Sequence, residues 1–115
     1  MKMDIEKMQE VLATKCMGWH RVKYHGVWSD WYDDQNKSMC LAPLWQPDCK
    51  WDQCGMVIEA MREKGWRCNL NDSYYPNVKA SWYRVGEPFW HYDGEGTECE
   101  ARMLAAARAL EVGDE

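Results

Sequence analysis

The first stretch of apolar and polar residues has the spacing of an amphipathic helix. Ile5, Met8 and Leu12 recur at i, i+3 and i+7 with charged residues between them, which places them on one helix face. Asp4 precedes this face and can accept hydrogen bonds from the first backbone amides. The pattern predicts a helix over Asp4–Lys15.

A second helix is predicted after Pro47 and Asp48, because proline is excluded from helix interiors and aspartate can cap a helix. Gly65 supplies the left-handed residue with which helices commonly end. The predicted inward-facing residues are Trp51, Cys54, Ile58 and Met61.

A third helix is predicted after Thr97, which forms a T-x-x-E capping box with Glu100. Its alanines allow close approach to a sheet, and Arg102 and Arg108 are expected on the outside. The predicted inner face consists of Met103, Ala106, Ala107 and Leu110.

Alternating patterns between these helices predict strands. A turn at His25-Gly26 joins the first two, and Pro43 limits the third to a sheet edge. The predicted strands are Trp19–Tyr24, Val27–Trp28, Met39–Leu44, Trp66–Leu70, Val78–Tyr83 and Phe89–Tyr92.

The remaining segments are polar or rich in turn-forming residues. Asp30–Ser38 is polar apart from Trp31 and Tyr32, which predicts a surface loop. Turns are predicted at Asn71–Ser73 and Arg84–Pro88, and Asp93–Gly96 is expected to end the sheet. Short connections of this kind imply a mostly antiparallel sheet covered by the N-terminal, central and C-terminal helices, which is an α+β fold.

Composition limits the fold to one domain and excludes several classes of protein. The chain has 115 residues, of which 46% are hydrophobic and 29% charged, as in a globular domain, so we expect one unit over residues 1–115. Apolar runs are far shorter than the roughly 18 residues of a membrane span, and no export signal is evident. The net charge of −5 disfavours nonspecific binding of duplex DNA. We expect a soluble, unexported protein whose six cysteines are free, buried thiols.

Five segments of the chain follow one another in a recognisable order: Leu12–Trp19, Pro47-Asp48, Met61–Trp66, Trp82-Tyr83 and the alanine-rich helix from Glu100. This order resembles the phage ABA-sandwich domain family. The resemblance implies a three-layer α/β/α sandwich and a phage protein acting in the cytoplasm of a bacterial host. That family brings no established reaction, cofactor or catalytic residue.

Enzymatic and metal chemistry find little support in the sequence. Cys49 and Cys54 have loose zinc-type spacing and no C-x-x-C pair accompanies them, so a structural zinc is the weaker alternative to packing. Cys68 or Cys99 could be combined with His91 into a nucleophilic site, but a chain with six cysteines allows many such combinations. No glycine-rich phosphate-binding motif is present. We therefore expect no enzyme, no cofactor and no metal.

Aromatic residues are the unusual feature of the composition, with eight Trp and six Tyr against one Phe. Five tryptophans adjoin predicted core elements and are expected to be structural: Trp19, Trp45, Trp51, Trp66 and Trp82. The remaining three tryptophans and three of the tyrosines lie in or beside polar turns, where they either fold back as a lid or form an exposed patch: Trp28, Trp31, Tyr32, Tyr74, Tyr75 and Trp90.

Our leading hypothesis is a non-catalytic phage accessory protein that binds and inhibits a bacterial host protein, such as a CRISPR-type component of antiviral defence. Loop aromatics would anchor the contact, and an acidic rim would speed the encounter with a basic target. The predicted contact residues are Trp28, Asp30, Trp31, Tyr32, Asp33 and Asp34.

Two alternatives remain open. The first is a sponge that sequesters a nucleotide immune signal at a subunit interface formed by self-association, with aromatic rings stacking on bases. The residues of that site would be Tyr74, Tyr75, Lys79, Arg84 and Trp90. The second is a phage morphogenesis or lysogeny component.

Overall fold

The computed structural model describes residues 4–21, 23–28, 30–40, 44–71, 78–84 and 91–113. Its helices are α1 (Ile5–Val11), which continues as the π-helical turn η1 (Leu12–Cys16), α2 (Trp51–Glu63) and α3 (Glu98–Gly113). Its strands are β1 (Lys23–Tyr24), β2 (Val27–Trp28), β3 (Trp31–Tyr32), β4 (Ser38–Cys40), β5 (Trp66–Asn71), β6 (Val78–Arg84) and β7 (His91–Gly96).

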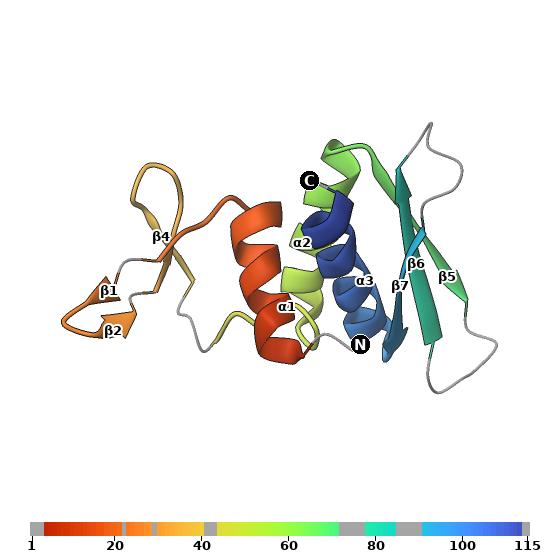
Figure 1. Ribbon diagram of the computed structural model, residues 1–115, viewed down its shortest axis with the longest axis horizontal. Coiled ribbons are helices and arrows are strands. Elements are labelled where there is room, and N and C mark those ends of the chain that lie inside the picture. Colours follow the sequence, from red (N-terminus) through yellow and green to blue (C-terminus); the bar gives the residue numbers. More distant parts are fainter. Residues whose placement is uncertain are drawn as a thin grey trace.

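The arrangement is α+β, as predicted, with the helices between two regions of strands (Figure 1). At one end, β5, β6 and β7 form an antiparallel sheet, and α3 lies against β6 and β7. Both α1 and α2 contact α3, and the antiparallel pairs β1–β2 and β3–β4 lie at the opposite end of a molecule measuring 47 × 31 × 26 Å.

The three-layer sandwich with a central sheet is not confirmed. In the part of the chain that the structure describes, α1, α2 and α3 all lie on the same side of the β5–β6–β7 sheet (Figure 1). The side chains that alternate away from α3 include Arg67, Asn69 and Lys79, and all three are exposed. Polar residues on this face are typical of an antiparallel sheet that meets water on one side.

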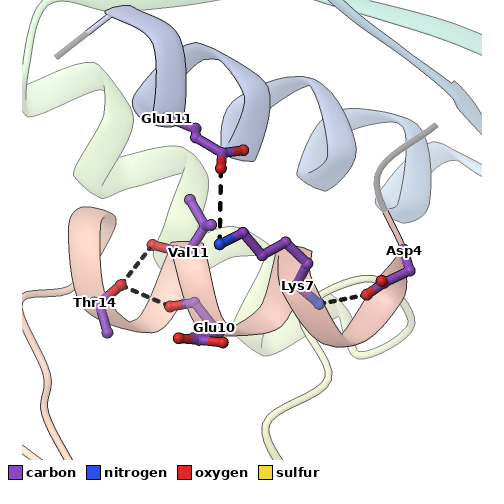
Figure 2. A network of polar contacts seen from close by, with 6 residues as sticks. All are labelled: Asp4, Lys7, Glu10, Val11, Thr14 and Glu111. Atoms are coloured by element: carbon purple, nitrogen blue, oxygen red, sulfur yellow. Dashed lines mark hydrogen bonds and ion pairs between the residues drawn. The ribbon is translucent and has the colours of Figure 1, made fainter. Parts of the chain in front are cut away.

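The first predicted helix is confirmed. Its last turn is π-helical, which is wider than an α-helical turn. Asp4 caps α1, because its Oδ1 accepts a 2.7 Å hydrogen bond from the backbone amide of Lys7 (Figure 2). In η1 the amide of Met17 donates to the carbonyl of Leu12 at 3.0 Å, five residues earlier. A surface ion pair of 3.7 Å joins Lys7 to Glu111 of α3, but exposed pairs contribute at most about 1 kcal/mol.

The second predicted helix is also confirmed, but its start differs from the prediction. Lys50 is the N-cap residue and makes no side-chain capping bond. Asp48 instead accepts a 3.2 Å hydrogen bond from Nε2 of Gln9 on α1, so it joins two segments rather than capping α2. Gly65 ends the helix with φ +92°, as predicted.

The inward face of α2 was predicted incorrectly at Trp51, which is 61% exposed. The fully buried residues are Cys54, Val57 and Met61, so the buried face is centred near Met61. At about 100° per residue, Trp51 lies roughly 90° from the centre of that face. Its position in the first turn, at the edge of the packed region, leaves the indole in water.

More residues of α3 are buried than the four predicted for its inner face. Met103, Ala106, Ala107 and Leu110 are buried as predicted, and the further buried residues include Ala101 and Ala105. Glu100 donates its amide to Oγ1 of Thr97 at 3.3 Å, which confirms the threonine side of the capping box.

Strand β7 explains this close approach and corrects another prediction. Asp93–Gly96 was expected to end the sheet, but β7 runs through Gly96 and pairs with β6. A Cβ at Gly94 would collide with the backbone of Ala101 and Ala105, so this glycine lets α3 lie directly on the strand. On β6, Val78, Ala80 and Trp82 are buried in the predicted alternation, and Nε1 of Trp82 donates to the carbonyl of Arg102 at 2.8 Å.

The hairpin predicted around His25-Gly26 is confirmed. Both residues have positive φ, 51° and 80°, and join β1 to β2 as a two-residue turn. The loop predicted over Asp30–Ser38 is wrong at Trp31 and Tyr32, which form β3 and pair with β4. Backbone bonds between His20 and Tyr32, at 2.8 and 2.9 Å, hold β3 from its other side. Residues 41–43, 72–77 and 85–90, and with them two predicted turns, lie outside the described residues.

Candidate functional site

The aromatic anchor predicted at Trp31 is not exposed. Its side chain is 4% exposed, and the Arg21 guanidinium lies 4.4 Å from the centroid of its ring. Pairing of β3 with both β4 and His20 fixes Trp31 in a sheet rather than in a loop. Trp31 is therefore part of the core of the free protein.

The acidic residues of that predicted contact site differ in their exposure and in their contacts. Asp33 shapes its own turn, because its Oδ1 accepts from the amides of Gln35 at 2.9 Å and Lys37 at 2.8 Å. Tyr32 and Asp30 are half-buried, and Asp34 is exposed. The side chain of Trp28 lies outside the described residues.

The two basic residues of the alternative ligand site do not lie close together. Lys79 and Arg84 lie five positions apart on β6, which places them on opposite faces of the sheet and about 17 Å apart along the strand. Arg84 lies over the ring of Trp66, 4.7 Å from its centroid. Tyr74, Tyr75 and Trp90 lie outside the described residues.

A cavity of about 230 Å³ lies between α1 and the segments that carry β3 and Trp45. Nε1 of Trp45 donates to the carbonyl of Gln9 at 2.9 Å, and the Trp45 ring packs edge-on against Trp19 with centroids 4.7 Å apart. These contacts join the segment around Trp45 to α1 and to Trp19, which follows η1. The cavity is lined by Glu6, Gln9, Glu10, Arg21, Trp31 and Trp45.

Thiols from three elements gather near Arg102, but they are held in a form unsuited to catalysis. Burial, together with a hydrogen bond to the Cys99 thiol, raises the pKa of the Cys54 thiol to about 12. Burial also raises the pKa of Cys68 and of Cys99. Protonated thiols are poor nucleophiles and poor metal ligands. Among residues that the structure describes, no three His, Cys, Asp or Glu side chains are placed to hold a metal ion.

The surface that stands out is on α2. Of the tryptophans whose side chains are described, Trp51 is 61% exposed, whereas the others are 5% exposed or less: Trp19, Trp31, Trp45, Trp66 and Trp82. Gly55 and Glu59 follow Trp51 at i+4 and i+8, and both are exposed.

We call this surface the Trp51 face. It occupies one side of α2 because its members are separated by the spacings that bring helical residues onto a common face. The helix presents an indole, an adjacent glycine and two carboxylates on this side. The Trp51 face consists of Trp51, Asp52, Gly55, Ile58, Glu59 and Arg62.

Sequence reasoning missed this face because Trp51 also fits the spacing of the buried residues of α2. A signal was nevertheless present at Gly55. Glycine in a helix interior costs about 1 kcal/mol relative to alanine, so its occurrence there calls for a reason such as close approach by another group.

The chain matches no protein-family model, no curated protein and no solved structure. Within the described part of the chain, no helix has the length and apolar character needed to cross a membrane. A function therefore has to be inferred from the chain's own residues.

Proposed function

We propose that this protein is a non-catalytic binding protein that acts by covering the surface of another protein through its Trp51 face. The observation that carries the proposal is the exposure of Trp51, at 61%, in a chain whose other described tryptophans are buried in the core. An indole buries a large apolar area with little loss of rotamer freedom, and tryptophan is enriched at the residues that dominate binding energy.

The surroundings of Trp51 support a protein partner rather than a small ligand. Trp51 lies on the exposed side of α2 and does not line the cavity. Its indole is therefore open to contact by the surface of another protein. Asp52 is adjacent to Trp51, Glu59 lies about two turns further along α2, and both are exposed, which favours a partner with Lys or Arg beside an apolar centre. This contact site replaces the predicted one, in which Trp31 is buried.

The biological setting is part of the same proposal. We propose that the partner is a bacterial host protein, that the chain is a phage accessory protein acting in the host cytoplasm, and that the partner is a defence component of the CRISPR type. The resemblance to a phage family supports this setting. The net charge of −5 suits binding to a protein that itself binds nucleic acid, rather than to duplex DNA.

Affinity capture with matched variants tests this function. Tagged wild-type protein, Trp51→Ala and Val27→Ala are incubated with bacterial lysate, and recovered proteins are quantified by mass spectrometry. Val27 is the control because it is also a strongly exposed apolar side chain, at 69%, but lies on β2. We expect a host protein that wild type and Val27→Ala recover equally and that Trp51→Ala recovers about tenfold less.

Two results would count against the function. Recovery of no host protein above a tag-only sample would contradict a binding role in that host. Equal recovery by wild type and Trp51→Ala would exclude the Trp51 face as the contact surface. Circular dichroism of each variant confirms that the compared chains are folded.

A further inference from the structure

Gly55 differs from five other glycines of the chain, because neither its backbone conformation nor a neighbouring group requires a glycine there. Gly18, Gly26, Gly65 and Gly96 have positive φ, and Gly94 lies against the backbone of α3. Gly55 has a helical backbone in the middle of α2, and a Cβ added there would meet nothing within 4 Å. The missing side chain therefore gives the folded chain no packing advantage and lowers the stability of the helix.

The position of Gly55 suggests what the missing side chain permits. Residues four apart form the ridges with which helices pack into one another, and Trp51, Gly55 and Glu59 make up one such ridge. At Gly55 the ridge is interrupted by a notch, bounded by the exposed indole on one side and a carboxylate on the other. A notch of this form accepts a side chain from a crossing helix and lets the two backbones approach closely.

The charged residues beside the notch indicate which charges a bound partner helix would carry. Asp52 lies about one turn before Gly55 and Glu59 about one turn after it, and the exposed Arg62 lies on the same face about two turns beyond Gly55. An approaching helix that places Lys or Arg beside its apolar residues would pair with the two carboxylates next to the notch. An acidic helix would be repelled.

We propose that the Gly55 notch seats an amphipathic α-helix of the partner protein, with an apolar residue inserted beside Trp51 and basic residues against Asp52 and Glu59. The proposal rests on the proposed function, because it specifies the form of the partner that the Trp51 face binds. In this arrangement Gly55 leaves the space that the inserted side chain fills, and the Trp51 indole contacts that side chain.

A displayed peptide library tests the proposal without knowledge of the partner. Random 20-residue peptides on yeast are sorted for binding to the wild-type protein and counter-sorted against Trp51→Ala. We expect enriched peptides to carry apolar residues at helical spacing with Lys or Arg beside them. They should bind Gly55→Leu about tenfold or more weakly, since the added side chain fills the notch. No enrichment, enrichment of acidic or proline-interrupted peptides, or equal binding to Gly55→Leu would overturn the proposal.

Control variants separate this proposal from the function on which it rests. Lys15→Leu adds the same side chain at an exposed position of η1 and is expected to leave peptide binding unchanged. If Trp51→Ala loses the captured host protein and Gly55→Leu retains it, the helix in the notch is wrong and the function stands. If neither variant loses it, the function fails as well. Sedimentation of the wild type as a dimer and of Gly55→Leu as a monomer would identify the occupant as a second copy of this chain and overturn the partner helix.

Discussion

At the scale of single residues, glycine has opposite roles at two positions of this chain. Gly94 is required where it stands, because α3 occupies the space that a side chain would need. Gly55 has open space around it and a helical backbone, so the folded chain would tolerate alanine there. The contrast separates a glycine that serves packing within the molecule from one that we assign to binding.

The same substitution at both positions tests this distinction. We expect Gly55→Ala to raise the free energy of unfolding by about 0.5–1 kcal/mol, because alanine loses less backbone entropy in a helix. Gly94→Ala should lower it by about 1–3 kcal/mol, because α3 must move away from β7. Urea unfolding monitored by circular dichroism measures both, and destabilisation by Gly55→Ala would show that Gly55 has an internal packing role.

The buried thiols predict a loss of stability at alkaline pH. Burial raises the pKa of the Cys16 and Cys54 thiols from about 9, the value of an exposed thiol, to about 12. Their contribution is fully present below pH 9 and is lost as the pH rises toward 12, because only the unfolded chain releases these protons. Each thiol should lower the free energy of unfolding by about 1.4 kcal/mol per pH unit in that range.

Variants at these thiols provide the control for the alkaline effect. Cys16→Ala with Cys54→Ala should show a shallower dependence of the unfolding free energy on pH between 9 and 11 than the wild type, whatever its stability at pH 7. An unchanged slope would contradict the burial of these thiols.

At the scale of elements, the ends of the helices follow local rules and were accessible from the sequence. Asp4, Thr97 and Gly65 act as predicted because capping and left-handed stops depend on a few neighbouring residues. The outward position of Trp51 and the pairing of β3 depend on distant segments, so helical spacing and local polarity could not reveal them. Asp48 shows the same limit, since its partner Gln9 lies 39 residues away.

The cap of α3 provides a test at this scale. Thr97→Ala removes the hydroxyl that accepts from the Glu100 amide and should lower the free energy of unfolding by about 1 kcal/mol. Thr14→Ala is the matched control, because the Thr14 hydroxyl donates to the carbonyl of Glu10 within a helical turn, and its loss should change stability by less than about 0.5 kcal/mol. Equal effects in thermal or urea unfolding would contradict the capping role of Thr97.

At the scale of the whole molecule, most of the aromatic surplus serves the core. Trp66 and Trp82 are buried in the sheet region, whereas Trp19, Trp31 and Trp45 are buried where the strand pairs join the helices. The class of fold followed from the order of elements, but the layer order did not, because periodicity does not show which face of a sheet a helix covers. Trp51 remains as the exposed indole among those described, and the proposed function depends on it.

Fluorine NMR of the free protein tests this central claim most directly. The chain is labelled with 5-fluorotryptophan, each resonance is assigned by a Trp→Phe variant, and a soluble gadolinium chelate is added to broaden the signals of exposed indoles. The structure predicts that the Trp51 resonance broadens at far lower chelate concentration than those of Trp45, Trp66 and Trp82. Protection of Trp51 to the same degree as Trp45 would contradict the exposed binding surface on α2.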